Sequence, residues 1–138
     1  MKTIGIQIKS ATAILVVLEK DSAGLISQTN ESVKFDIQEP NDSKQVKQFR
    51  DQVNATFDSI KPHRIGIVAR NANAKGDRTP SPVSFKLEGI IQLYDKVDIE
   101  FIWPQTLIAH FKKNPKPHSA KHKYQEDAFN VSYYLNTK

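Results

Sequence analysis

Apolar residues alternate with polar ones at the start of the chain and then form a continuous run. Ile4, Ile6 and Ile8 fall on one face of the first segment, which is the period of a β-strand. Residues 13–19, AILVVLE, are almost wholly apolar, as in a strand that is covered on both faces. Residues 25–37, LISQTNESVKFDI, are more polar and predict a third strand nearer an edge. The short turns between these runs predict an antiparallel meander.

A helical period replaces the alternation after residue 40. Asp42 is a suitable N-cap, and Gln45 three residues later predicts a capping box. Pro62 ends the predicted helix, and the short apolar run at 64–69, RIGIVA, predicts a central strand. The apolar stripe of this helix recurs at spacings of three and four residues, and it comprises Val46, Phe49, Val53, Phe57 and Ile60.

A second amphipathic helix is predicted to begin at Pro82, with Ser81 as its cap. Gly89 inside this helix costs about 1 kcal/mol relative to Ala. We therefore expect a compensating close approach of Gly89 to another element. One face of the helix carries Val83, Leu87, Ile90, Ile91 and Tyr94.

The last part of the chain predicts one strand and two helices. Residues 97–103, VDIEFIW, predict the fifth strand, and Pro104 opens a short helix. Ser119 is the predicted cap of the closing helix. The residues expected to face inward are Leu107, Ile108 and Phe111 in the short helix, and Tyr124, Ala128, Val131 and Leu135 in the closing one.

The predicted order of elements is β-β-β-α-β-α-β-α-α. It indicates an α/β fold in which a five-stranded mixed sheet carries helices on both faces. The 138 residues fit one domain, 1–138. A chain of this size buries roughly two-thirds of its unfolded surface, so it needs neither disulfide nor metal to fold.

This order resembles the ribonuclease-H-like arrangement, and several segments resemble those of RuvC-type junction resolvases. Their first hairpin is similar to IGIQIKSATAILVVLE, their fourth strand to RIGIVAR, and the long helix that follows to FKLEGIIQLY. Their fifth strand with its proline-led helix is similar to VDIEFIWPQTLIAHFKK, and their closing helix to YQEDAFNVSYYL. A closer likeness, in GIQIK, IVAR and KG…FKLEGIIQL, is to a small bacterial family of unknown function. The resemblance implies the fold and supplies no activity.

Composition narrows the classes of function. The chain has no Cys, which excludes a disulfide framework, Cys-zinc sites and thiol catalysis. The N-terminus lacks the pattern of a signal peptide, and no run approaches the ~20 apolar residues of a membrane span. We expect a cytoplasmic protein without a membrane partner.

The resemblance to nucleases implies carboxylates on the first strand, at the end of the fourth strand and on the last helix. Together these would hold two Mg²⁺ ions. The first position falls at Gln7 and the second at 68–70, where no residue is acidic, while Glu126 and Asp127 remain in the last helix. We therefore assign no metal or other cofactor and predict a non-catalytic protein.

One alternative is a Mg²⁺-dependent nuclease with a displaced site. Glu88, Glu126 and Asp127 are its candidate catalytic carboxylates. A surface interaction of Glu88 with Lys86 or Gln92 on the same helix is the competing interpretation.

Positive charge is concentrated in the second half of the chain. Residues 1–60 hold 7 Lys or Arg and 8 Asp or Glu, whereas residues 61–138 hold 13 and 7. The loop after the fourth strand and the segment 110–123 are both basic, and we expect them at one end of the sheet, where α/β proteins bind ligands. These two segments predict contacts to the phosphates of nucleic acid or to another polyanion. The competing interpretation is a basic surface that is only solvated. The predicted contact residues are Lys9, Arg70, Lys75, Arg78, Lys86, Lys112 and Lys113.

Most aromatic residues are committed to strands and helices, so the sequence does not favour a specialised single-strand binder. Trp103 and Tyr124 are the exceptions.

A second alternative is a structural dimer or adaptor. Phe85 lies off the apolar face of its helix, and Gly89 would allow a two-fold helix–helix contact through residues 85–94. The equivalent helix contributes to dimers in the resolvases that the chain resembles. In the competing interpretation Phe85 folds under its own loop.

Overall fold

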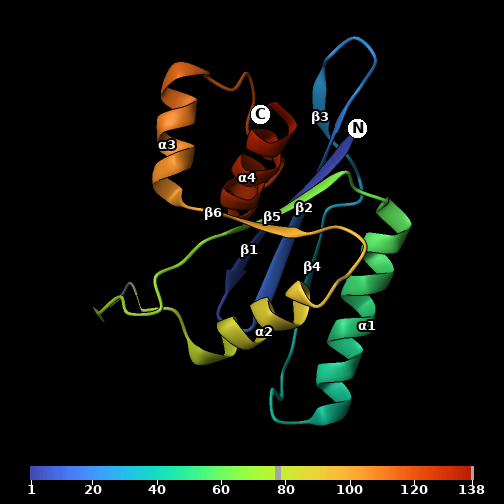
Figure 1. Cartoon of the computed structure of the whole chain (residues 1–138), viewed down its shortest axis with the longest axis vertical. Helices are drawn as coiled ribbons and strands as arrows, with labels where there is room; N and C mark the ends of the chain where they lie inside the picture. Colours follow the sequence, from blue (N-terminus) through green and yellow to red (C-terminus); the bar gives the residue numbers. More distant parts are fainter. Residues whose placement is uncertain (77–78, 138) are drawn as a thin grey trace.

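The computed structural model describes residues 1–76 and 79–137 (Figure 1). Within these residues, no helix is both long and apolar enough to span a membrane. The strands are β1 (Lys2–Lys9), β2 (Thr12–Lys20), β3 (Ile26–Gln28), β4 (Val33–Asp36), β5 (Arg64–Val68) and β6 (Ile99–Ile102). The helices are α1 (Ser43–Ile60), α2 (Pro82–Gln92), α3 (Pro104–Lys113) and α4 (Glu126–Thr137), the last preceded by the 3-10 turn η2 (Lys123–Gln125).

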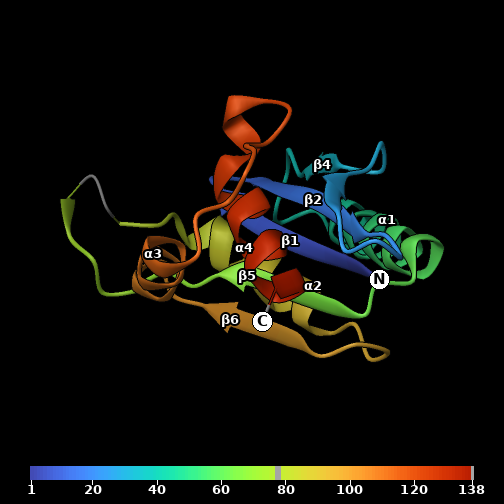
Figure 2. The same ribbon diagram turned by 90° about the horizontal axis from the view of Figure 1, so that it is seen from above.

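The strands form one mixed sheet in the order β3-β2-β1-β5-β6, with β4 also paired to β2. β1 and β2 are antiparallel, whereas β1, β5 and β6 are parallel neighbours. Helices α1 and α2 pack on one face, and α3 and α4 pack on the other (Figure 2). This arrangement confirms the predicted α/β fold and the mixed sheet with helices on both faces.

The predicted third strand is two short strands, so that part of the prediction is wrong. β3 and β4 both pair with β2, and residues 29–32 between them leave the ladder. In this interruption Thr29 N donates to Val17 O at 3.0 Å, and Val17 N donates to Ser32 Oγ at 3.1 Å. The Ser32 hydroxyl oxygen thus replaces a backbone carbonyl as the acceptor for Val17 N. Because β3 and β4 both pair with the same strand, β2, the sheet has six strands but is only five strands wide.

The closing helix α4 lies almost directly on the backbone of β1. A Cβ atom added to Gly5 would stand 1.9 Å from Ala128 O and 2.6 Å from Ser132 N. Thr3 Oγ1 donates to Ser132 O at 2.9 Å, and Ser132 Oγ donates to Thr3 O at 2.9 Å. Asn136 Nδ2 adds a bond to Thr3 Oγ1 at 3.0 Å. Glycine therefore permits the approach, and buried polar side chains fix it.

The start of α1 differs from the predicted capping box. Asp42 is the N-cap, as predicted, and accepts from Lys44 N at 3.0 Å. Gln45 Oε1 accepts from Glu39 N at 2.8 Å and not from the Asp42 backbone. Gln45 therefore holds the preceding turn, while the Asp42 side chain alone caps the helix.

Other local predictions divide into confirmed and wrong ones. Ser81 caps α2, as predicted, whereas Ser119 does not cap α4, because His122 caps the 3-10 turn before it. Ile108 is 67% exposed, since α3 packs through Leu107. Tyr124 also lies outside the core and is 47% exposed.

Two glycine substitutions test the packing of α4 on β1. Gly5→Ala should lower the free energy of unfolding by about 3 kcal/mol or more, because the added methyl group meets helix backbone that cannot move alone. Gly89→Ala is the matched control, since a Cβ there meets nothing within 4 Å. In the monomer, this substitution should raise the free energy of unfolding by roughly 0.5–1 kcal/mol. Chemical denaturation measures both, and equal effects would contradict the packing described.

The same control corrects a prediction made for Gly89. The glycine was expected to allow close approach to another element, but a Cβ at this position would have no neighbour within 4 Å among residues 1–76 and 79–137.

Candidate functional site

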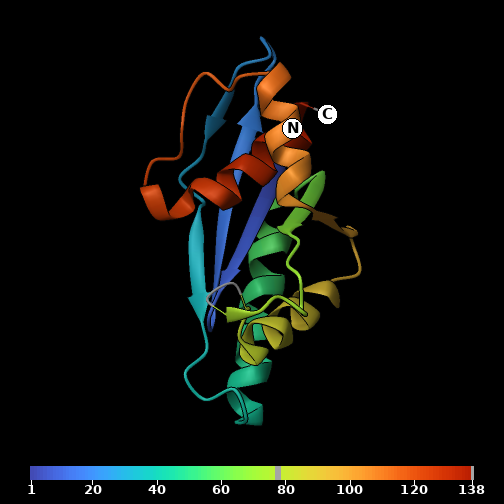
Figure 3. The same cartoon turned by 90° about the vertical axis from the view of Figure 1, so that its left-hand side faces the viewer.

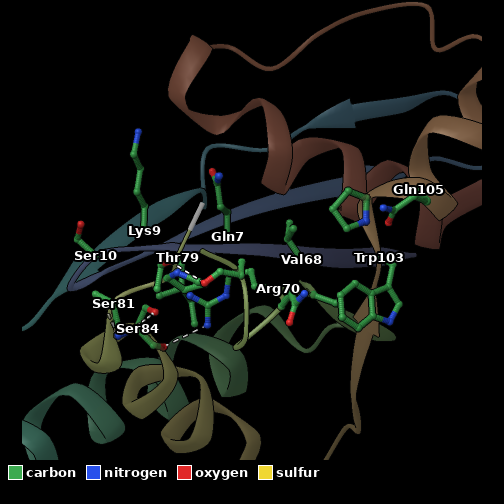
Figure 4. A pocket seen from close by; sticks show the side chains of 16 residues that line it. Gln7, Lys9, Ser10, Val68, Arg70, Thr79, Ser81, Ser84, Trp103 and Gln105 are labelled. Carbon is green, nitrogen blue, oxygen red and sulfur yellow. Dashed lines mark hydrogen bonds between the residues drawn. The ribbon is translucent and has the colours of Figure 1, made fainter. Parts of the chain in front are cut away.

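A groove with a volume of about 770 Å³ lies where β1, β5 and β6 end (Figure 4). These three strands are parallel and adjacent, so their carboxyl ends meet at one edge of the sheet. Such edges are where ligands bind in α/β sheets. The lining residues are Gln7, Ile8, Lys9 and Ser10 after β1, Val68, Ala69, Arg70, Asn71, Ala74, Thr79, Pro80, Ser81 and Ser84 after β5, and Trp103, Pro104 and Gln105 after β6.

Arg70 is held at the base of the groove. Its Nη2 donates to Glu88 Oε1 at 3.2 Å and to Ser84 O at 3.4 Å, and the guanidinium lies 4.4 Å from the centre of the Phe85 ring. The Arg70 and Glu88 side chains are only 13% and 14% exposed. The pair therefore fastens the loop after β5 to α2.

Glu88 was expected either to bind a metal ion or to contact Lys86 or Gln92 on the helix surface, and the structure shows a different partner. Glu88 contacts neither Lys86 nor Gln92 but forms its ion pair with Arg70, on the buried side of α2. Phe85 also packs on Arg70, which follows the competing interpretation that Phe85 covers its own loop. Arg70 Nε is buried and has no hydrogen-bond partner in the described part of the chain.

Gln7 and Asp127 meet at the edge of the groove. Gln7 Nε2 donates to Asp127 Oδ2 at 2.8 Å, which brings together the expected positions on the first strand and the last helix. The amide of Gln7 thus occupies one Asp127 oxygen with a donor.

Glu126 points elsewhere. Its carboxylate accepts from Lys116 Nζ and, at 3.0 Å, from Ala120 N. Burial raises the pKa of Glu126, but these two hydrogen bonds and the positive charge of Lys116 together outweigh burial and hold the pKa below its usual value. Glu126 therefore anchors the segment between α3 and α4.

The three candidate carboxylates do not converge, because Glu88, Glu126 and Asp127 have separate partners. Across residues 1–76 and 79–137, no group of three His, Asp or Glu side chains could hold a metal ion.

The predicted basic residues are spread over more than one surface. Lys9 is exposed and lines the groove, and Lys75 is exposed in the loop that borders it. Lys86 Nζ donates to Pro40 O. Arg78 lies outside the described residues.

The segment 110–123 does not share the groove, so the prediction that the two basic segments lie together is wrong. Lys112 and Lys113 belong to the last turn of α3, the end that points away from the loop after β5 (Figures 1 and 3). Farther along, His118 Nε2 lies 2.8 Å from Ile26 O, and Lys121 N donates to Gln28 Oε1 at 2.9 Å. The segment therefore packs along β3.

A family described as "Protein of unknown function (DUF3010)" matches residues 1–135. The chain belongs to this family. The match confirms the predicted membership of a family of unknown function. No curated protein matches the chain.

Solved structures confirm the ribonuclease-H-like fold. The chain is similar to T. thermophilus RuvC in complex with Holliday junction substrate, with TM-score 0.73 and 11% identity over 99% of this chain and 96% of that one. It is also similar to the fowlpox virus Holliday junction resolvase, with TM-score 0.57 and 15% identity over the whole of both chains. The yeast mitochondrial resolvase Ydc2 gives TM-score 0.58 and 8% identity over 98% and 75%.

Replacing Glu88 tests whether the Arg70–Glu88 pair is structural. Glu88→Gln leaves the largely buried Arg70 charge without a counter-ion and should lower the stability by roughly 3 kcal/mol. The double variant Arg70→Met/Glu88→Leu removes both charges and should recover most of this loss. Thermal or urea denaturation measures both variants. A double variant no more stable than Glu88→Gln would contradict this role of the pair.

Proposed function

We propose that the groove binds nucleic acid through its phosphates and does not cut it. The observation that carries this proposal is the charge at the two groove positions where the related nucleases are expected to hold carboxylates. Arg70 stands at the end of β5, and neutral Gln7 stands on β1. Neither position supplies the negative charge that a metal ion would need, and because Glu88 already offsets Arg70, Lys9 is the exposed groove cation to which an anion could bind.

Two observations support binding: the similarity of the fold to that of a resolvase, and the position of two exposed lysines at the groove. T. thermophilus RuvC, which is similar over nearly the whole chain, was solved with a Holliday junction substrate. In this chain Lys9 lines the groove, and neither Lys9 nor Lys75 has an ion-pair partner among the described residues. We assign the phosphate contacts to these two lysines, with Arg78 as a further candidate, and give Arg70 the role of holding the loop in place.

The proposed lack of cleavage follows from the needs of Mg²⁺. The ion binds hard oxygen ligands, and two such ions bring four positive charges that carboxylates must offset. Asp127 contacts the groove-lining residue Gln7, and its Oδ2 atom already accepts a hydrogen bond from the Gln7 amide. A displaced site made from Glu88 and Glu126 would first require breaking their ion pairs with Arg70 and Lys116.

Fluorescence anisotropy with labelled duplex, junction and single-stranded DNA tests this proposal. Binding should weaken steeply between about 50 and 200 mM salt. Lys9→Ala should weaken binding to every DNA and lower the salt slope by about 1. Lys113→Ala is the matched control on the far end of α3 and should leave affinity unchanged.

The same mixtures, incubated with Mg²⁺ or Mn²⁺, should remain uncut. Cleavage that disappears in Asp127→Asn would establish the nuclease alternative. Lack of any binding at about 50 mM salt would contradict the proposal as a whole.

One observation favours an additional contact between two copies through α2. Gly89 lowers the helix propensity of α2, yet none of the residues described in the structure packs on it, and nearby Leu93 is 70% exposed. A two-fold helix contact would account for both features.

Light scattering tests this contact. The protein should have the mass of a dimer, and Leu93→Asp should reduce it to that of a monomer because the new charge would be buried at the contact. A wild-type monomer at high protein concentration would rule the dimer out.

A further inference from the structure

We infer that the groove holds an unpaired nucleobase against the ring of Trp103, an inference that rests on the proposed function. The ligand class is therefore nucleic acid with single-stranded or branched character, and fully paired duplex binds less well. Four features of the groove carry the inference.

The first feature is the freedom of the Trp103 ring. Trp103 is 50% exposed and lines the groove. In the described part of the chain its side chain takes part in no hydrogen bond, ring stacking or cation–π contact, unlike His110, Phe111 and Tyr134 farther along the same region. A large apolar ring is thus left available beside a cavity.

The second feature is the fixed backbone beneath the ring. Trp103 is extended, with φ −74° and ψ 144°, and Pro104 follows it as the first residue of α3. A proline restricts the residue before it to extended conformations. Ile102 pairs with Val68 in the sheet immediately before this point. The ring is therefore carried by an ordered junction and loses little backbone freedom when a ligand binds.

The third feature is the division of the groove into two ends. Lys9 and Ser10 lie at one end, and Trp103 and Gln105 lie at the other (Figure 4). The ends belong to β1 and β6, which are separated by β5, so two strand spacings of about 4.8 Å lie between them. That spacing of roughly 10 Å between the two strand backbones corresponds to about three stacked base steps of 3.4 Å. Lys9 and Trp103 lie at opposite ends of the groove, so the inferred ligand is a single strand of a few nucleotides that places a phosphate near Lys9 and a base on Trp103.

The fourth feature is the chemistry of the exposed ring. An aromatic side chain stacks on the face of a base, and in a closed duplex these faces are already covered by neighbouring base pairs. Such stacking is tolerant of sequence, because every base has a π-face. The groove volume of about 770 Å³ lies within the range of roughly 300–1,000 Å³ for sites that enclose small ligands. The groove is thus large enough for a base and its sugar.

Tryptophan fluorescence tests the inference directly, because Trp103 is the only Trp of the chain. A single-stranded oligonucleotide and a hairpin-closed duplex, each with a remote label for anisotropy, are titrated at about 50 mM salt. We expect the single strand to quench the Trp103 emission and the duplex to leave it nearly unchanged. Anisotropy should show that both DNAs bind.

Variants separate stacking from charge. Trp103→Ala should weaken single-strand binding about tenfold and leave duplex binding unchanged, and Trp103→Phe should fall between Ala and the wild type. Tyr124→Ala is the matched control, since Tyr124 is 47% exposed but lies in η2 outside the groove. It should bind as the wild type does.

The outcomes distinguish this inference from the proposed function. Binding seen by anisotropy with unchanged fluorescence, or unchanged single-strand affinity in Trp103→Ala, would overturn base stacking while leaving phosphate binding intact. A blue shift that grows with protein concentration in the absence of DNA would also overturn it, because a second copy would then cover the ring. No binding of either DNA by anisotropy would overturn the proposed function itself.

Discussion

The backbone contact between α4 and β1 at Gly5 is the constraint on which the rest of the structure depends. The strand is central, and the helix approaches it so closely that a single Cβ would meet the carbonyl of Ala128 at 1.9 Å. At Gly66 on the neighbouring strand, a Cβ would likewise meet side chains of Val131 and Leu135 at 2.8 Å. Because α4 is fixed at these points, its first turn reaches the carboxyl edge of the sheet. Asp127 is thereby brought to Gln7.

At the groove on that edge, two pairs of polar side chains already bind each other. Glu88 offsets Arg70, and the amide of Gln7 donates to Asp127. A metal ion would have to displace these internal donors before it gained a ligand. A phosphate would need only an exposed cation, and Lys9 supplies one at the rim. The paired arrangement therefore supports the proposal of an anionic ligand that is bound and released unchanged.

The sequence predicted the features that depend on the spacing of apolar residues along the chain. It missed the features that depend on contacts between residues distant in the sequence. The order of elements and the amphipathic stripe of α1 follow from spacing alone, and Phe49 in that stripe is indeed buried. The break between β3 and β4 was missed because the polar run at 27–32 was attributed to an exposed edge strand, whereas Ser32 Oγ there accepts from Val17 N in place of a ladder carbonyl. In the site, the meeting of the first strand and the last helix was predicted. The ion pair of Arg70 with Glu88 was not, because the two residues are 18 apart and only the folded loop brings them together.

The central claim is that the carboxyl edge of the parallel strands is the ligand site. The most direct test is to map by NMR the backbone amides whose signals shift when an oligonucleotide is added. The account predicts that the largest shifts cluster at residues 7–10, 68–71 and 103–105, which line the groove from three strands. Shifts confined to residues 112–123, along α3 and β3, would contradict it. They would make the basic segment the binding surface and leave the groove without a ligand.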